Sequence, residues 1–495
     1  VDFSKDATTK EILAALGNGT ALPTSTYIGI KDNLLSFFGR ANYTMMDKYL
    51  FTFTMRADGS SKFAKGNQWG YFPSGAVAWR IFDEPFMNNT KEWLSNLKVR
   101  ASYGTSGNNR IPSGSMYTTY SVAGTSDKGI YFDETTAIVL KHGNVLSNPS
   151  LKWETTISRN AGIDFGFFNN ALNFTVDYYK KTTNGMLMTM NIPSYVGESK
   201  PIGNVGKMEN SGLELEGSYK FTHRDFNFRI GGNLTYLKNK LIEYGNDTGW
   251  ANLDAFQGVG TISRAQNGEP FPYFYGYKTN GVFQNMAEVK AYTYTDAEGT
   301  ETMIQPAAVP GDVRFVDLNG DGKISDDDRT KIGKGMPDWT YGVNFTVNYK
   351  NFDLNMMWQG TIGNDIFDST RRSDITATNL PSWMLNRWTG EGTSNKLPRF
   401  VLGDNVNWQS SDLYVKDGTY LRLKNIQLGY TLPESLTRKV FVSSVRFYVA
   451  AENLLTFTKY DGFDPEISSG GTSLGIDRGV YPQARTFTVG ANLSF

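Results

Sequence analysis

Oxygen-bearing side chains between Asp317 and Asp328 have the spacing of a calcium-binding loop. Such oxygens occupy loop positions 1, 3, 5, 9 and 12, and glycine stands at position 6. In loops of this kind alternate side chains point inward, position 7 offers its backbone carbonyl, and the glycine permits a sharp turn. The pattern predicts a Ca²⁺ site formed by these residues: Asp317, Asn319, Asp321, Lys323, Ser325 and Asp328.

Two features separate this loop from a calcium sensor. Asp328 stands where an EF-hand has glutamate, so its shorter carboxylate would reach the ion through one oxygen or through water. No apolar helical periodicity flanks the loop. We therefore expect a structural calcium ion in a loop. The alternative is a turn rich in Asp, Asn and Gly whose side chains cap its own backbone.

Residues for other chemistry are sparse. Cysteine is absent, which excludes disulfides and thiolate nucleophiles, and His142 and His223 are the only histidines. His142 falls in an expected long loop and His223 in an expected tight turn. The sequence also has no phosphate-binding glycine motif. With 49 basic and 49 acidic residues, the chain has no excess charge for nucleic acid. The sequence predicts neither an enzyme nor a nucleic-acid-binding protein.

Aromatic residues make up 14% of the chain, a share that suits membrane-interface girdles and sugar-stacking surfaces. Three tryptophans and one tyrosine fall in one expected long loop: Trp383, Trp388, Trp408 and Tyr414. They would either stack on sugar rings or pack the loop, and the sequence does not decide between these roles.

The elements that must position these residues are strands with one apolar and one polar face. The last strand alternates Phe487, Val489 and Ala491 with polar residues, and its ten residues at ~3.3 Å rise and ~45° tilt would span roughly 23 Å. No apolar run of ~18 residues is present, so helical membrane spans are not expected. About thirteen strands are predicted: 33–44, 49–58, 72–81, 97–104, 154–167, 171–181, 208–221, 226–237, 339–350, 351–361, 416–430, 444–453 and 485–495.

The connections between these strands alternate between short and long. The long ones are 59–71, 105–153, 182–207, 238–338, 362–415 and 454–484. Outer-membrane barrels have short periplasmic turns and longer extracellular loops. The chain is therefore predicted to be all-β, a transmembrane antiparallel β-barrel, with 238–338 a long extracellular loop that carries the calcium motif. In a soluble multi-sheet protein, nothing requires the short connections to lie at one end of the strands and the long connections at the other.

The strand count adds an expectation about completeness. If strand 485–495 ends in the periplasm, strand 33–44 runs toward the periplasm and residues 1–32 form an extracellular segment. An odd number of strands with ends on opposite sides does not close a bacterial barrel. We expect strand 33–44 to pair with a segment outside this numbering.

Several segments resemble the C-terminal half of SusC/RagA-like TonB-dependent outer-membrane transporters. The matching stretches are DKYLFTFTMRADGSSKF (Asp47–Phe63), WGYFPSGAVAWRI (Trp69–Ile81), LKVRASYGTSGN (Leu97–Asn108), PGDVRFVDLNGDGKISDDDR (Pro310–Arg329), LGYTLP (Leu428–Pro433) and AENLLTFTKYDGFDPE (Ala451–Glu466). The resemblance implies that 33–495 is the C-terminal portion of a 22-stranded plugged barrel in the outer membrane of a Gram-negative bacterium.

The resemblance also implies a function and partners. The protein would import oligosaccharides or peptides together with a SusD-like surface lipoprotein, with the TonB complex as energy source, while outer-membrane lipid surrounds the barrel. The plug and the TonB-contacting box have no counterpart in this sequence. A polar inner face that includes Arg56, Arg100, Asp177, Glu214 and Glu216 implies a hydrated lumen. The alternatives are a passive porin or adhesion barrel, and an outer-membrane hydrolase with a His or an acid pair at the outer rim.

Overall fold

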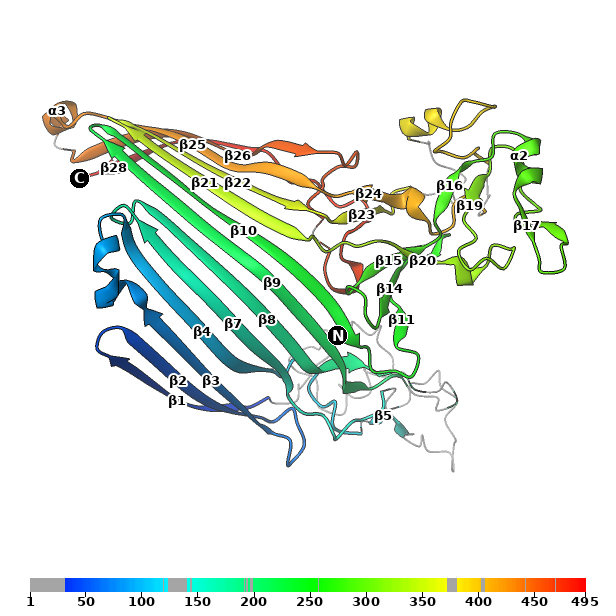
Figure 1. Ribbon diagram of the computed structural model, residues 1–495, viewed down its shortest axis with the longest axis horizontal. Helices are drawn as coiled ribbons and strands as arrows, with labels where there is room; N and C mark the ends of the chain where they lie inside the picture. The colour runs from blue at the N-terminus through cyan, green and yellow to red at the C-terminus, as the bar shows by residue number, and fades with distance from the viewer. Residues whose placement is uncertain are drawn as a thin grey trace, which may run out of the picture.

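Thirteen antiparallel strands lie side by side in one sheet of the computed structural model (Figure 1). The structure describes residues 32–118, 120–122, 140–142, 145–190, 192, 195, 199–256, 258–371, 381–401, 406–440, 442–467 and 469–495. The strands follow one another in sequence order: β1 (Leu34–Met45), β2 (Tyr49–Ser60), β3 (Trp69–Arg80), β4 (Leu94–Asn108), β7 (Glu154–Phe167), β8 (Leu172–Thr189), β9 (Ile202–His223), β10 (Phe226–Glu243), β21 (Trp339–Tyr349), β22 (Phe352–Ile362), β25 (Tyr420–Thr431), β26 (Ser444–Thr458) and β28 (Thr486–Ser494). The predicted all-β fold and its thirteen strands are confirmed.

Several strands run further than the alternation of apolar and polar residues predicts, and the longest extensions are on three neighbouring strands. β8 continues to Thr189, β9 begins at Ile202, and β10 continues to Glu243. These ends pair with one another, as Thr189 with Ile202 and Glu243 with Lys207, and register shifts interrupt the pairing beyond Asn184 and beyond Leu241. A shift of register breaks the period of two, which explains why the pattern did not reveal these ends.

The two faces of the sheet differ as predicted. On one face Tyr178, Leu213, Tyr236 and Trp339 lie opposite one another across four strands. Large apolar side chains on this face are exposed, for example Phe53 at 56% and Val489 at 84%. Exposed apolar surface of this extent needs a non-aqueous neighbour, and lipid is the neighbour that an outer-membrane barrel has. Within the described residues no helix has the length and apolar character to cross a membrane.

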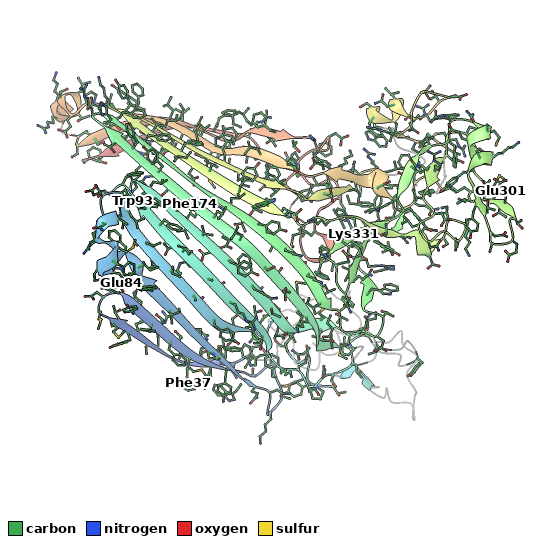
Figure 2. The ribbon with its side chains drawn as sticks, viewed as in Figure 1. Phe37, Glu84, Trp93, Phe174, Glu301 and Lys331 are labelled. Carbon is green, nitrogen blue, oxygen red and sulfur yellow. The ribbon has the colours of Figure 1, made fainter. Side chains whose placement is uncertain are left out.

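Aromatic pairs gather where the short turns connect the strands. The rings of Phe352 and Tyr430 lie 4.7 Å apart and those of Phe221 and Phe226 6.5 Å apart. Trp93 lies at the same end of the sheet, beside the segment that carries Glu84 (Figure 2). Tyr43 stacks on Phe51 at this side too, so aromatic side chains form a girdle near the short turns.

The long connections fold into small elements of their own at the opposite end of the sheet (Figure 1). Their strands are β5 (Tyr120–Val122), β6 (Leu140–His142), β11 (Trp250–Asn252), β12 (Ala255–Phe256), β13 (Gly260–Thr261), β14 (Ser263–Gln266), β15 (Tyr273–Gly276), β16 (Thr279–Val282), β17 (Thr293–Thr295), β18 (Glu301–Met303), β19 (Val313–Phe315), β20 (Thr330–Gly333), β23 (Asp365–Asp368), β24 (Val415–Asp417) and β27 (Ile476–Asp477). The α-helices are α2 (Met286–Ala291) and α3 (Glu434–Thr437), and the 3-10 helices are η1 (Ile81–Asp83), η2 (Pro85–Thr90), η4 (Asp326–Asp328), η5 (Ser382–Asn386), η6 (Asp412–Tyr414), η7 (Arg438–Val440) and η8 (Gly471–Ser473). α3 and η7, like η1 and η2, lie on the short-turn side.

The two outermost strands, β1 and β28, do not pair with each other in the described sheet. β1 pairs with β2 and β28 pairs with β26, so the thirteen strands form an open sheet with two free edges. This agrees with the expectation that strand 33–44 does not close on strand 485–495. Of the predicted extracellular segment 1–32, all but Asp32 lies outside the described residues.

Candidate functional site

The polar face of the sheet carries a network of ion pairs that the strand register brings together. Arg100 on β4 lies 2.5 Å from Asp177 on β8 and 3.3 Å from Asp164 on β7, and Lys98 lies 2.8 Å from Asp164. Arg100, Gly162 and Asp177 are successive partners across the three strands. Because Gly162 has no side chain, the Arg100 guanidinium and the Asp177 carboxylate can meet across β7. A Cβ at this position would come within 2.2 Å of the Asp177 carboxylate.

The other residues predicted for the inner face lie on the same side of the sheet. Glu214 is the cross-strand partner of Asp177, Glu216 is that of Thr175, and Arg56 pairs with Asp58 at 2.6 Å. At the far side of the sheet Arg446 pairs with Asp353 at 2.5 Å. Charged and amide side chains over this whole face make it the water-facing wall of the barrel.

Three of the loops at the other end share a hydrophobic core. Segments 238–338, 362–415 and 454–484 all contribute to it: Phe256, Ile262, Phe274, Phe367, Met384, Trp408, Tyr414 and Ile476. β23 pairs with β24 and, in parallel, with β27, which joins the last two segments. The loops therefore form a packed unit that can hold side chains at fixed positions.

A cavity of roughly 900 Å³ opens in this unit. Its lining includes the indole of Trp383, the amides of Asn386 and Asn395, and charged groups of both signs. Its size is that of a site for a small or medium ligand. The charged residues of the lining are Arg371, Lys396, Asp412, Lys416, Asp417, Lys459 and Asp461.

Two of the cavity's four cations are anchored by a buried carboxylate, Asp368. Arg371 and Lys416 each lie 3.0 Å from Asp368, and Lys416 also pairs with Asp461 of the next loop. Burial alone would raise the pKa of Asp368, but the hydrogen bond from Thr370 and the charges of Lys416 and Arg371 outweigh it and lower that pKa. The Arg371 guanidinium lies over the Trp383 ring, 4.5 Å from its centroid. These contacts fix one aromatic face and two cations in the cavity wall.

The three tryptophans and the tyrosine of the 362–415 loop divide between two roles. Tyr414 is fully buried and Trp408 nearly so, and both belong to the shared core. Trp388 packs beside Gly311, where a Cβ would come within 2.4 Å of its ring. These three pack the loop, whereas Trp383 also lines the cavity and remains the aromatic residue there that can meet a ligand.

In the predicted calcium loop, side-chain oxygens accept hydrogen bonds from the loop's own backbone. The Asp317 carboxylate accepts from Gly320 N at 2.7 Å and from Gly322 N at 2.9 Å, and Asn319 accepts from Asp321 N at 3.0 Å. Gly322 has a φ of +83°, so the sharp turn at position 6 is present. This is the capped turn that the sequence left open as an alternative.

The end of the same loop is held by Asp328, which is completely buried. It accepts from Leu318 N at 2.8 Å and from Ser325 N at 2.8 Å, while Lys323 Nζ lies 3.6 Å from Asp321. In the described part of the chain no three His, Cys, Asp or Glu side chains are arranged to hold a metal ion. Those hydrogen bonds leave the second lone pairs of the same oxygens unassigned, and calcium binding by this loop stays a prediction.

His223 is not among the residues that line the cavity. His223 ends β9 at the short-turn side, where its ring stacks on Phe221 at 6.4 Å, and His142 lies in β6. Sequence reasoning missed Arg371, Lys416 and Asp461 because they come from two loops. Their approach depends on the parallel pairing of β23 with β27, and no local motif signals that pairing.

Comparisons with known proteins agree with this architecture. Residues 2–454 match the family model "TonB dependent receptor-like, beta-barrel". The chain is 37% identical to TonB-dependent receptor P3 of Formosa agariphila over 97% of this chain and 47% of that protein. It is 30% identical to TonB-dependent receptor SusC of Bacteroides thetaiotaomicron over 96% of this chain and 45% of that protein. The chain thus spans about half the length of the curated relatives it matches.

The fold is also similar to solved structures. The RagAB peptide transporter superimposes with a TM-score of 0.74 at 27% identity, over 94% of this chain and 48% of that one. The RagAB peptide importer in its open-open state gives a TM-score of 0.76 at 25% identity. The chain therefore belongs to the TonB-dependent receptor-like β-barrel family and lies in the outer membrane of a Gram-negative bacterium.

Proposed function

We propose that this chain forms the C-terminal part of the barrel of an active, SusC-like transporter that imports oligosaccharides or peptides. The observation that carries the proposal is the pairing of a water-facing wall of ion pairs with a packed loop unit that encloses a cavity. The first would line the path of a polar cargo, and the second would receive that cargo outside the membrane. The similarity to SusC and to the RagAB peptide transporter supports both cargo classes.

The partners follow from the same similarity. A SusD-like surface lipoprotein would act together with the loop unit, and the TonB complex would supply energy from the periplasmic side. The family is one of transporters and not of enzymes, and we propose that the chain acts without a catalytic centre. Its work is the recognition and passage of a polar solute.

Uptake measurements in a host strain test this proposal. Accumulation of an isotope-labelled oligosaccharide pool and of a labelled peptide pool is compared in the wild type, a strain lacking this gene, and a strain lacking TonB. We expect one pool to lose uptake in both mutant strains. Uptake that needs this gene but continues without TonB would identify a passive porin, and uptake that needs neither would refute a role in import.

The same uptake assay also tests whether the cavity recognises the cargo. Replacing Trp383 with Ala removes the ring that faces the cavity, so we expect uptake at low cargo concentration to fall several-fold, as for the loss of one stacking contact of about 0.5–1.5 kcal/mol. Trp250→Ala is the matched control, because Trp250 is an exposed indole of the same loop unit outside the cavity lining. Equal effects of the two variants would contradict cargo recognition by Trp383.

A further inference from the structure

The outer edge of the lipid-facing band can be placed on β10. Phe226 begins the strand at the short-turn side, and Tyr236 packs against Trp339 with ring centroids 4.9 Å apart. The ten-residue step from 226 to 236 covers ~34 Å along the strand, or ~24 Å across the membrane at ~45° tilt. This matches the height of the apolar band of an outer-membrane barrel, ~25 Å. Tyr236 and Trp339 therefore mark its extracellular boundary.

Lysines follow at once beyond this boundary on the same face. Lys238 and Lys240 are two and four residues past Tyr236, so they share its face, and both are exposed. Lys180 of β8 lies in register with Lys238, with Ser211 of β9 between them. Each step of two residues adds ~5 Å of height at this tilt. The lysines thus lie at the level of the lipid headgroups.

A cleft of roughly 360 Å³ lies between these β10 lysines and the loop unit. Gly268, Glu269 and Pro270 form one wall, and Lys331 and Lys334 of the segment after β19 contribute two further ammonium groups. Figure 2 shows Lys331 where the strand ends meet the loop unit. The cleft thus lies where β10 continues past its pairing with β21, and its lining includes Lys238 and Lys240 on the lipid-facing side of β10.

The charges of the cleft do not balance. Lys331 pairs with Glu269 and Lys334 pairs with Asp338, which accounts for the two carboxylates of the lining. Within the described residues no carboxylate lies within 4.0 Å of Lys238 or Lys240. Glu209 is the cross-strand partner of Lys240, but it pairs with Lys180 at 2.9 Å, so the charges of Lys238 and Lys240 remain in excess. An anion at headgroup level would supply the missing charge, and lysine ammonium groups bind phosphate well as point charges.

We propose that this cleft binds a phosphate group of a phosphorylated glycolipid in the outer leaflet of the outer membrane. The lipid's phosphate lies between Lys238, Lys240 and Lys331, and its acyl chains run down the outer wall past Tyr236 and Trp339. The inference needs only the membrane location of the barrel and does not depend on the transported cargo.

Native mass spectrometry of the intact receptor in detergent tests the proposal, with purified lipid A as the probe. The receptor is titrated with lipid A, with enzymatically dephosphorylated lipid A, and with phosphatidylglycerol. The test variant is K238Q/K240Q. The control is K181Q/K220Q, which removes the same charge from exposed lysines on the lumenal face of β8 and β9.

We expect K238Q/K240Q to weaken lipid A binding by roughly 30-fold, from the usual contribution of each lysine near a charged lipid surface. The control variant should bind as the wild type does, and dephosphorylated lipid A should bind the wild type as weakly as the test variant binds lipid A. Unchanged binding by the test variant would overturn the site. Equal binding of the dephosphorylated probe would overturn phosphate recognition, and equal binding of phosphatidylglycerol would overturn the assignment to a glycolipid.

Discussion

Arg100 and Asp177 form an ion pair of 2.5 Å although a whole strand, β7, lies between the strands that carry them. The pair crosses above Gly162, which has no side chain to separate the two groups. Asp177 also lies directly opposite Glu214 on β9, so two carboxylates share one cross-strand position. Arg100 thus offsets a repulsion between like charges on the lumenal wall.

Loss of Arg100 should therefore destabilise the barrel through Glu214. We expect Arg100→Gln to cost roughly 0.2–1 kcal/mol, the usual size of an unfavourable cross-strand charge pair. Adding Glu214→Gln should recover most of that cost. Thermal unfolding of the four proteins of this double-mutant cycle in detergent measures the coupling, and additive effects of the two substitutions would show that the carboxylates do not interact.

Charge placed on the lipid-facing side should damage the barrel far more than charge on the lumenal side. Val343→Arg or Phe345→Arg puts a guanidinium near the middle of β21, at a cost of roughly 2–4 kcal/mol each near the bilayer midplane. Asn344→Arg is the matched lumenal change, since its partners are Gly231 and Met357. Thr346 is a weaker control because it lies opposite Arg229. The fraction of folded barrel in outer-membrane preparations is the measurement, and equal losses on both faces would contradict the face assignment.

Calcium binding by the loop at 317–328 predicts protection that depends on the ion. In the wild type, millimolar calcium should slow proteolysis within 238–338 relative to chelator, and Asp317→Ala with Asp321→Ala should abolish that response without changing the heat resistance of the barrel. The affinity should be modest, as at extracellular sites with a Kd of ~10⁻⁴–10⁻³ M.

The control for that experiment must separate ion binding from backbone capping, because Asp317 also accepts two backbone hydrogen bonds. Asp296→Ala removes a comparable cap, to Thr300 N at 2.7 Å, in the β17–β18 turn. It should raise proteolysis equally with and without calcium. If the wild type is cleaved at the same rate in calcium and in chelator, the loop does not bind calcium and is a capped turn only.

The lowered pKa of Asp368 predicts a loss of loop stability in acid. A carboxyl whose pKa is lower in the folded state stabilises that state above its unfolded pKa, about 3.9, and the contribution is lost as the pH falls through the folded value. Asp368→Asn should therefore expose 362–415 to proteolysis at neutral pH, and the difference from the wild type should shrink as the pH falls through the lowered pKa of Asp368. A difference that persists in strong acid would mean that Asp368 acts through its shape and not its charge.

The strands of the barrel could be predicted because lipid on one side and water on the other impose a period of two on every strand. Strands such as β21 follow that pattern, with Phe345 facing lipid and Thr346 the lumen. Register shifts interrupt it locally, as at Met357–Trp358 of β22 and Leu423–Asn425 of β25. The pattern ends where the membrane ends. Beyond Asn184 and Leu241 both faces are covered by protein or water, and the strand ends there could not be predicted.

The loop unit was less predictable for the same physical reason. Its core joins Phe274, Phe367 and Ile476 from three segments, and contacts between segments leave no periodic signal in any one of them. The sequence identified the Asp317–Asp328 turn, because turns are local, but not the cavity beside Trp383 or the lysine cleft beside Lys238. Both depend on how separate segments meet.

The central claim is that these strands form the wall between lipid and a hydrated lumen, and the absence of cysteine from this sequence makes it directly measurable. Single cysteines are introduced at successive positions of β21, from Val343 to Asn348, and reacted with a membrane-impermeant, water-soluble maleimide in intact outer membranes. The receptor without an introduced cysteine gives the background.

We expect cysteines at Asn344, Thr346 and Asn348 to react and those at Val343, Phe345 and Val347 to remain unlabelled. A hydrophobic maleimide dissolved in the bilayer should give the opposite pattern. Reactivity that does not alternate along β21, or alternation with the two faces exchanged, would contradict the account.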